Sequence, residues 1–267
     1  MIGTRGDIVK IWYQSALNFD QHPNYEEVLA AHLDRVASPG TEVILSDRSS
    51  GFGREIDRAE FAGSFDAYRA VVAPEFMKSL LTAEAVGAEA FVAASFSEPN
   101  LTELRSAAHI PITSMAEASL MAAFMDAPTV GLITLRKGFV RAVEQSILSH
   151  HVHDHLRGVH PLEGDISEIE LDANLASPGP YLDRLVAAVR DAIAAGARAV
   201  IPAGGLLGLL AAENGLQEVD GVPVIDSVGA PVLFAELAVT LKARTGAARG
   251  DGGYPAVPGA RRLPVAG

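Results

Sequence analysis

Short apolar runs alternate along the chain with longer segments whose apolar residues recur every three or four positions. The longer segments, such as Asn24–Ala37 with its apolar residues on one face, have the spacing of amphipathic helices. The short runs have the length of buried strands, and together the two patterns predict an α/β fold with mainly parallel sheets. The predicted strands are Ile8–Tyr13, Thr41–Leu45, the run that follows Gly87, Ile110–Ser114, Thr129–Leu135, the run that follows Gly196, and Val222–Asp226.

One part of this pattern occurs twice, about 110 residues apart. The segment Gly87–Ser97 matches Gly196–Gly205, and a helical segment and a second short strand follow each of them. This predicts two similar, pseudo-symmetric α/β halves, over residues 8–128 and 129–244. The alternative is that the two segments match by chance, because Gly-Ala after a helix and Pro before a strand are common in β-α-β units. Residues 245–267 are rich in Gly, Ala, Pro and Arg without apolar periodicity, which predicts a disordered tail.

Composition and charge exclude several classes of function. Of the 267 residues, 49% are hydrophobic, so the chain can bury a large core in one or two domains. The formal net charge of −12 argues against a nucleic acid or an acidic membrane surface as partner, since both require clustered Lys and Arg. The amino end lacks a hydrophobic signal region, and the most apolar window, residues 194–212, changes from a strand pattern to a helix pattern. We therefore expect a cytoplasmic protein without a membrane partner.

The chain has no cysteine, so its chemistry must use oxygen, imidazole or amine groups. Five of the eight histidines fall between His150 and His160. On a helix, His151 and His155 would share a face, but a zinc site needs a third protein ligand and a supporting shell. A solvated helix end is the favoured interpretation, and no metal site is predicted.

The glycine turn after the second repeat predicts one wall of a ligand site. The apolar run ends at Gly204 and Gly205, and a helical segment begins directly after them. Ligands of open α/β sheets bind at the carboxyl ends of strands, and a glycine turn that opens a helix leaves backbone N–H groups free for an anion. The matching turn at Ser95–Ser97 predicts the opposite wall. No Gly-x-Gly-x-x-Gly follows the first strand, and no cofactor is predicted.

With these motifs in place, the chain resembles the aspartate/glutamate/hydantoin racemase superfamily over residues 8–244. The resemblance implies two similar α/β halves with a small carboxylate or amide substrate between them, and a homo-oligomer. The residues that carry it are Glu89–Leu101, Ile110–Ile112 with Glu117 and Ala118, Gly131–Thr134, the glycine turn after Ile201, and Val222–Asp226.

The chain departs from this superfamily at its two characteristic thiols. Racemases of the superfamily place one cysteine on either face of the substrate carbon, and the corresponding positions here are Ser95 and Gly204. A two-base racemase needs an acid on one face and a base on the other, which neither serine nor glycine supplies unaided. The chain is therefore similar to a cysteine-less, racemase-like subgroup, and the resemblance implies a fold and a site position but no reaction.

Ten residues are predicted to form the site. The catalytic candidates are Ser95, Glu117 and Tyr13. Of these, Tyr13 or Glu117 is the candidate for proton transfer, and a histidine brought in by folding is a further possibility. The alternative structural roles are a turn residue for Ser95, a helix-end charge for Glu117 and a core aromatic for Tyr13. Thr134 is a ligand candidate that would otherwise cap the next helix. The predicted substrate-binding residues are Gln14, Ser15, Phe96, Ser97, Thr134, Gly204 and Gly205.

The leading functional hypothesis is an isomerase or lyase that moves a proton or a carboxylate next to a carbonyl of a small carboxylic acid or cyclic amide. Two alternatives remain open: a hydrolase on the same scaffold, and a small-molecule binding protein that has lost catalysis. A perturbed, buried carboxylate or histidine that faces the cleft would favour an enzyme, and a pocket of hydroxyl and backbone groups alone would favour the binding protein.

Overall fold

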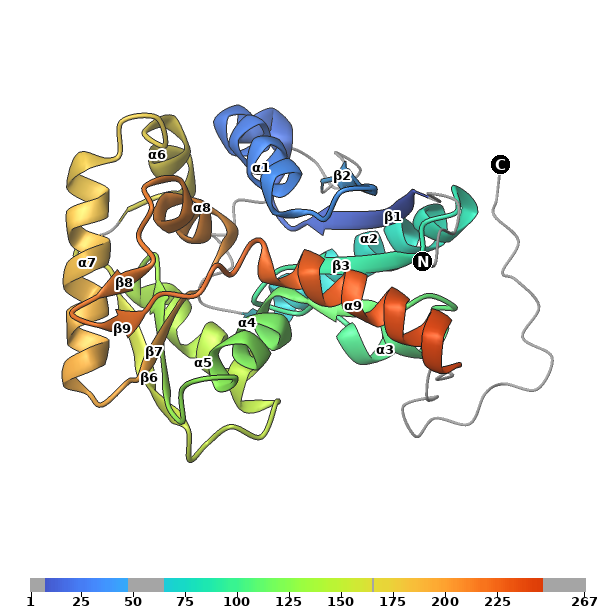
Figure 1. Ribbon diagram of the computed structural model, residues 1–267. Coiled ribbons are helices and arrows are strands. Elements are labelled where there is room, and N and C mark those ends of the chain that lie inside the picture. Colours follow the sequence, from blue (N-terminus) through green and yellow to red (C-terminus); the bar gives the residue numbers. More distant parts are fainter. Residues whose placement is uncertain (1–7, 48–64, 165, 247–267) are drawn as a thin grey trace.

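Four parallel strands form the first sheet of the computed structural model, which describes residues 8–47, 65–164 and 166–246 (Figure 1). The predicted tail lies outside these ranges from residue 247 onward. The first strand is predicted to end at Tyr13, but it continues through Gln14 and Ser15, because Gln14 pairs in register with Ser46 and Ala93. In spatial order the strands are β2 (Thr41–Ser46), β1 (Val9–Ser15), β3 (Ala90–Ala94) and β4 (Ile112–Ser114).

The second sheet repeats this strand order. Its three parallel strands are, in spatial order, β6 (Leu156–Pro161), β5 (Val130–Thr134) and β7 (Ala199–Pro202). Val224 forms one parallel bridge to Val200 of β7, at the position that β4 occupies beside β3 in the first sheet. The two halves therefore share one topology with parallel sheets, as the repeated motif predicts.

Two segments of the second half differ from the sequence prediction. Leu156–Pro161 form the edge strand β6, where the sequence analysis predicts no strand, and the half-buried positions of β6 lack an apolar pattern. The predicted strand over residues 222–226 is reduced to β9 (Val222–Pro223), which pairs antiparallel with β8 (Glu218–Val219). Asp220 and Gly221 between them have φ values of 51° and 77°, the left-handed pair that a tight hairpin turn requires.

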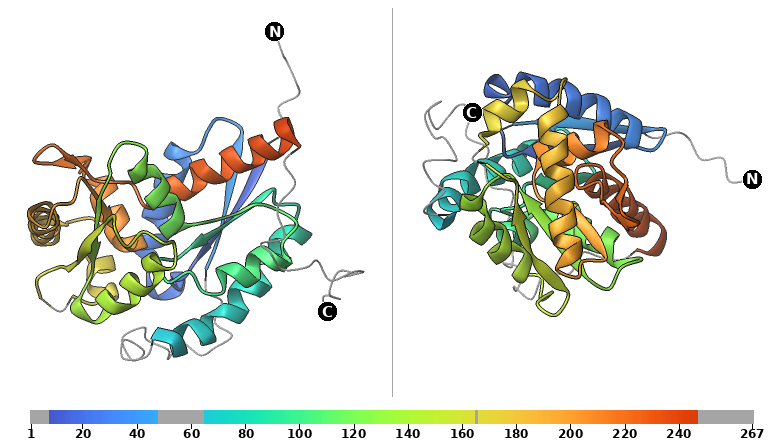
Figure 2. Two further views of the ribbon diagram at one scale, coloured as in Figure 1. Left: turned by 90° about the horizontal axis from the view of Figure 1, so that it is seen from below. Right: turned by 90° about the vertical axis from the view of Figure 1, so that its left-hand side faces the viewer.

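The helices cover both faces of the sheets. Phe91 and Ala93 of β3 pack against α2 (Phe65–Ala85) and α3 (Leu101–Ala107), while the alternate residues of β3 face α9 (Ala230–Thr245). The strand is buried on both faces, which explains its continuous apolar run. On the second sheet, α7 (Gly179–Ala194) covers the outer face (Figure 2). The remaining helices are α1 (Pro23–Val36), α4 (Met115–Phe124), α5 (Val140–Leu148), α6 (Glu168–Ala173) and α8 (Gly205–Glu213), with short 3₁₀ turns at Phe19–Gln21 and Lys137–Phe139.

One continuous apolar cluster includes side chains from both sheets. It extends from Ile11 and Val92 of the first sheet to Leu132 and Ile201 of the second. Within the described residues, no helix combines the length and apolar character that spanning a membrane requires. The shared core holds the carboxyl ends of the two sheets in a fixed relation to each other.

A histidine joins α1 to the second half beside this core. His32 of α1 donates through Nδ1 to Glu213 of α8 at 3.1 Å and through Nε2 to Asp226 at 2.9 Å. Both partners are carboxylates, so both contacts favour the doubly protonated ring. Burial acts to lower the pKa of His32, but the hydrogen bonds and charges of Asp226 and Glu213 outweigh it and raise the pKa above 6.5.

The contact of His32 predicts a pH-dependent stability. Since the folded pKa of His32 is raised, its contribution is complete below about pH 6.5 and is lost as the pH rises through the folded value. We expect His32→Gln to lower the free energy of unfolding by roughly 1 kcal/mol near pH 6, a modest figure because Asp226 is partly exposed, and by much less near pH 9. Thermal unfolding at both pH values measures this.

The matched control is His109→Gln. His109 also contacts a carboxylate, Glu84, but its side chain is 77% exposed, so the pair contributes little at either pH. An equal loss of stability in the His32 variant at both pH values would contradict the charged contact.

Candidate active site

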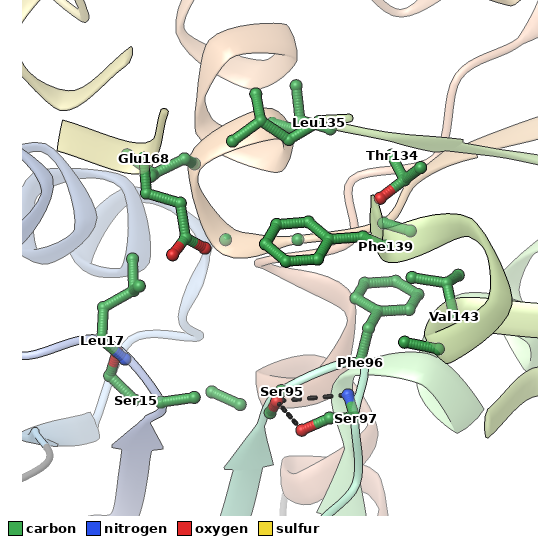
Figure 3. Close-up of a pocket in the computed structure, with 18 of the residues that line it drawn as sticks. Ser15, Leu17, Ser95, Phe96, Ser97, Thr134, Leu135, Phe139, Val143 and Glu168 are labelled. Atoms are coloured by element: carbon green, nitrogen blue, oxygen red, sulfur yellow. Dashed lines mark hydrogen bonds between the residues drawn. The ribbon is translucent and has the colours of Figure 1, made fainter. Parts of the chain in front are cut away.

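A cavity lies where the carboxyl ends of both sheets meet. Ser15 ends β1, Ser95 follows β3, Thr134 ends β5 and Ala203 follows β7, and all four line the cavity (Figure 3). Parallel strands deliver their carboxyl ends to one edge of a sheet, so the two repeats bring their equivalent strand ends together here. The structure thus gathers seven of the predicted site residues around one space: Ser15, Ser95, Phe96, Ser97, Thr134, Gly204 and Gly205.

Two serines form a hydroxyl pair on one wall. The Oγ atoms of Ser95 and Ser97 lie 2.7 Å apart, and the backbone N–H of Ser97 donates to Ser95 Oγ at 3.2 Å. Both residues are only 4% exposed, and Phe96 between them also lines the cavity. Each hydroxyl thus has a neighbour that fixes its position, as a site that orients a ligand requires.

The amino end of α8 forms a second wall. Gly204, the residue before the helix, has a φ of 151°, which side-chain-bearing residues rarely adopt, and no side-chain hydrogen bond caps the helix among the described residues. A Cβ at Gly205 would lie 2.5 Å from the phenol oxygen of Tyr25, so the helix begins in close contact with α1. The first N–H groups of such a helix suit a carboxylate or a developing oxyanion.

A buried hydroxyl is left without a partner beside that wall. Thr134 is 1% exposed, its Oγ1 has no hydrogen-bond partner in the described part of the chain, and the residue lines the cavity. Figure 3 shows its oxygen directed into the cavity rather than toward a helix end. A buried hydroxyl without a partner is costly, so its position is consistent with a ligand that completes it.

The sequence analysis did not identify Glu168, which lies at the start of α6. Among the described residues that line the cavity, it supplies the one carboxylate, and Figure 3 shows this group directed inward on the side across from Ser95 and Ser97. The pattern Ser167-x-x-Glu170 predicts a helix start here, and Ser167 Oγ does accept from the N–H of Glu170 at 3.0 Å. No local pattern indicates that this helix reaches a cavity built from distant strands.

A second carboxylate on the same helix anchors it. Asp172 lies four residues after Glu168, one helical turn away, and is 3% exposed. It accepts from the backbone N–H of Tyr25 at 2.7 Å and from Asn24 Nδ2 at 3.2 Å, which caps the first turn of α1 from outside. The capping contact fixes α6 against α1, and the fixed helix carries Glu168 to the cavity.

Three predicted site residues do not line the cavity. Tyr13 is fully buried, and burial together with nearby Tyr25 and Asp226 raises its pKa well above 10, so the phenol stays neutral. Gln14 donates to the backbone oxygens of Ser15 at 2.9 Å and Asp47 at 2.8 Å. Its contacts are those of a residue that holds the strand end in place.

Glu117, the third of these residues, begins α4. Its N–H donates to Ser114 Oγ at 3.1 Å, and its carboxylate pairs with Arg105. These are the contacts of a helix-end charge. Within the described ranges of the chain, no three or more His, Asp or Glu side chains lie together in a group that could hold a metal ion.

Comparison with known proteins places the chain in a family. The family model described as Asp/Glu/Hydantoin racemase matches residues 24–235. A hydantoin racemase of Rhizobium meliloti is 28% identical over 170 residues, which cover 64% of this chain and 68% of that protein. One of Pseudomonas sp. (strain NS671) is 26% identical over 188 residues, covering 70% and 72%.

Solved structures of allantoin racemases share the fold. The enzyme from Klebsiella pneumoniae superimposes with a TM-score of 0.72 at 24% identity, covering 92% of this chain and 94% of that one. The enzyme from Pseudomonas fluorescens gives a TM-score of 0.73 at 19% identity, covering 97% and 100%. The resemblance stated from the sequence motifs is confirmed, and at these identities the structures show the fold alone.

The unpartnered hydroxyl of Thr134 gives a test of the cavity. We expect Thr134→Val, which keeps the shape and removes the hydroxyl, to leave the free energy of unfolding unchanged or raise it by up to about 1 kcal/mol, because no hydrogen bond is lost. We expect the same variant to weaken the binding of any carboxylate or amide ligand that stabilises the wild type. Thermal unfolding with and without ligand measures both effects.

Thr113→Val is the matched control. Thr113 is also buried, but its hydroxyl donates to the backbone oxygen of Pro231 at 2.9 Å, so its removal breaks a hydrogen bond and should cost about 1 kcal/mol. A Thr134 variant as destabilised as the Thr113 variant, with unchanged ligand binding, would exclude Thr134 from the site.

Proposed function

Because the chain belongs to the Asp/Glu/hydantoin racemase family, we propose that it is an isomerase that moves a proton at a carbon next to a carbonyl of a small carboxylic acid or cyclic amide. Oxygen groups replace the thiols of the family in this proposal. The observation that supports it most is the Glu168 carboxylate, directed into the cavity across from the Ser95 and Ser97 hydroxyls. With this carboxylate the lining is not the set of hydroxyl and backbone groups alone that a binding protein would favour.

Glu168 has the role of the proton carrier. It takes a proton from the carbon next to the carbonyl, the C–H bond breaks, and its electron pair moves onto the carbonyl oxygen. The N–H groups at the start of α8 and the Thr134 hydroxyl lie where they can stabilise that oxygen. A proton from solvent then adds to the opposite face of the carbon, which restores the carbonyl and completes the isomerisation, and Glu168 releases its proton to solvent.

The lining favours a substrate with an apolar substituent. Apolar side chains from both halves surround the polar groups, and a pocket of this kind binds the apolar part of a ligand while a few polar groups orient it. The relatives named for hydantoin support a cyclic amide as the part that reacts. The apolar lining residues include Leu17, Phe96, Leu135, Phe139, Val143, Leu206 and Leu207.

Solvent deuterium incorporation tests this function. The protein is incubated in D₂O with hydantoins that carry apolar or polar substituents, with amino acids and with small carboxylic acids, and proton NMR follows the carbon next to the carbonyl. We expect exchange, fastest with an apolar hydantoin. Hydrolysis without prior exchange would favour the hydrolase, and ligand-induced stabilisation without any reaction would favour the binding protein.

Glu168→Gln tests the proton carrier. Removing a general base costs about 10² to 10⁴ in rate, so we expect a loss of exchange of that size with the folded state retained. Glu170→Gln is the matched control: Glu170 lies on the same helix, is exposed and accepts from Tyr181 at 2.8 Å. It should keep the wild-type rate. Near-normal exchange in the Glu168 variant would remove this residue from the reaction.

A further inference from the structure

We propose that Glu98 and His150 are positioning residues of this site, a pair that joins the two halves and holds the Ser95–Ser97 turn at the correct place for the substrate. The proposal rests on the proposed function for its effect on turnover, but the contact between the two residues is tested independently below. His150 belongs to the histidine cluster at residues 150–160. The proposed proton transfer gives no role to the histidines of this cluster.

Glu98 is the residue directly after the hydroxyl pair and is only 4% exposed. One carboxylate oxygen accepts from His150 Nε2 at 2.7 Å, and the other accepts from Ser114 Oγ at the end of β4. A buried carboxylate is stable only when it is paired and hydrogen-bonded, and these contacts provide both. Glu98 is therefore fixed from two directions.

The turn that Glu98 belongs to has an unusual backbone. Glu98 and Asn100 have φ values of 44° and 48°, in the left-handed region that residues other than glycine seldom occupy. The N–H of Glu98 donates to the oxygen of Ser95 at 3.2 Å, which closes the turn around the hydroxyl pair. Strained backbone of this kind persists where surrounding contacts determine it, and the carboxylate of Glu98 makes such contacts.

His150 brings these contacts from the other half of the molecule. It follows α5, and α5 contributes Ala142 and Val143 to the cavity. Figure 3 shows Val143 beside Phe96 of the turn. The contact between His150 and Glu98 therefore fixes α5 and the turn as one wall, with Ser95 and Ser97 on its first-half side.

The charge of His150 is set by its surroundings. The hydrogen bond from His150 to Glu98 raises the pKa of the imidazole, burial opposes the rise, the charges of Glu98 and Glu117 add to it, and Arg105 acts against it. The result is a pKa above 6.5. The contribution of the pair is thus complete below about pH 6.5 and is lost as the pH rises through the folded value.

NMR titration tests the contact without any substrate. We expect the His150 ring to titrate above its ordinary pKa, and the backbone amide signals of Phe96 and Ser97 to follow the same titration. In Glu98→Gln, which keeps an acceptor for Ser114 but loses the charge, the pKa of His150 should fall and the amide signals should no longer respond. Amide signals that are indifferent to His150 in the wild type would overturn the proposal, whatever the protein catalyses.

Kinetics with a substrate from the exchange panel test the consequence. We expect His150→Gln to raise KM by about tenfold at pH 6 and to abolish the wild-type decline of kcat/KM with rising pH. His153→Gln, from the same cluster but exposed, should change neither quantity.

A His150 variant that loses stability while KM and the pH profile stay at wild-type values would show a purely structural role and refute positioning. If the wild-type protein turns over no substrate, the proposed function fails, and the NMR titration alone decides whether Glu98 and His150 position the turn.

Discussion

Parallel strand pairing is the constraint on which the site depends. In each sheet the central strands must end at the same edge, and the shared core fixes the two edges toward each other. A residue placed after β3 or β7 therefore reaches the cavity without any special local signal. The identical strand order of the two sheets gives the cavity related walls: a hydroxyl-bearing turn from the first half and a glycine turn with an open helix end from the second.

Several buried and half-buried carboxylates have different roles in the structure, and the surroundings of each carboxylate set its role. Asp172 caps a helix, Asp226 and Glu213 hold a histidine, and Glu98 holds another. Each of these has its charge satisfied by fixed partners in the protein. The Glu168 carboxylate also lies among cavity-lining residues and is directed into the cavity. The same functional group thus caps a helix at Asp172 and holds a histidine at Glu98, according to what surrounds it.

Local patterns predicted the parts of the fold that depend on apolar burial. The strands around Phe91 and Ile201 were predicted because their residues are buried on both faces, and the Gly204 turn because only a few residue types allow it. The edge strand over residues 156–161 was missed because an edge strand needs no apolar run. The strand predicted over residues 222–226 is instead part of a hairpin, because Asp220 and Gly221 adopt the left-handed backbone of its turn.

Prediction of the site was limited by distance along the chain. Ser95 and Gly204 follow buried strands, so the topology alone places them. Glu168 belongs to a short helix whose position depends on Asp172 reaching the first turn of α1, a contact between residues 147 positions apart that no local pattern reveals. Glu117 has the same local features as a catalytic carboxylate, yet an arginine from α3 pairs with it.

The backbone at Gly204 has a consequence for the side chains that this position can carry. Its φ of 151° suits glycine, although the space around a Cβ there is open, so any side chain would first need a different path of the chain into α8. Ser95 differs from cysteine by a single atom and requires no such change. The two positions are therefore unequal: a thiol at position 95 needs only a point substitution, whereas a side chain at position 204 also needs a rearrangement of the main chain.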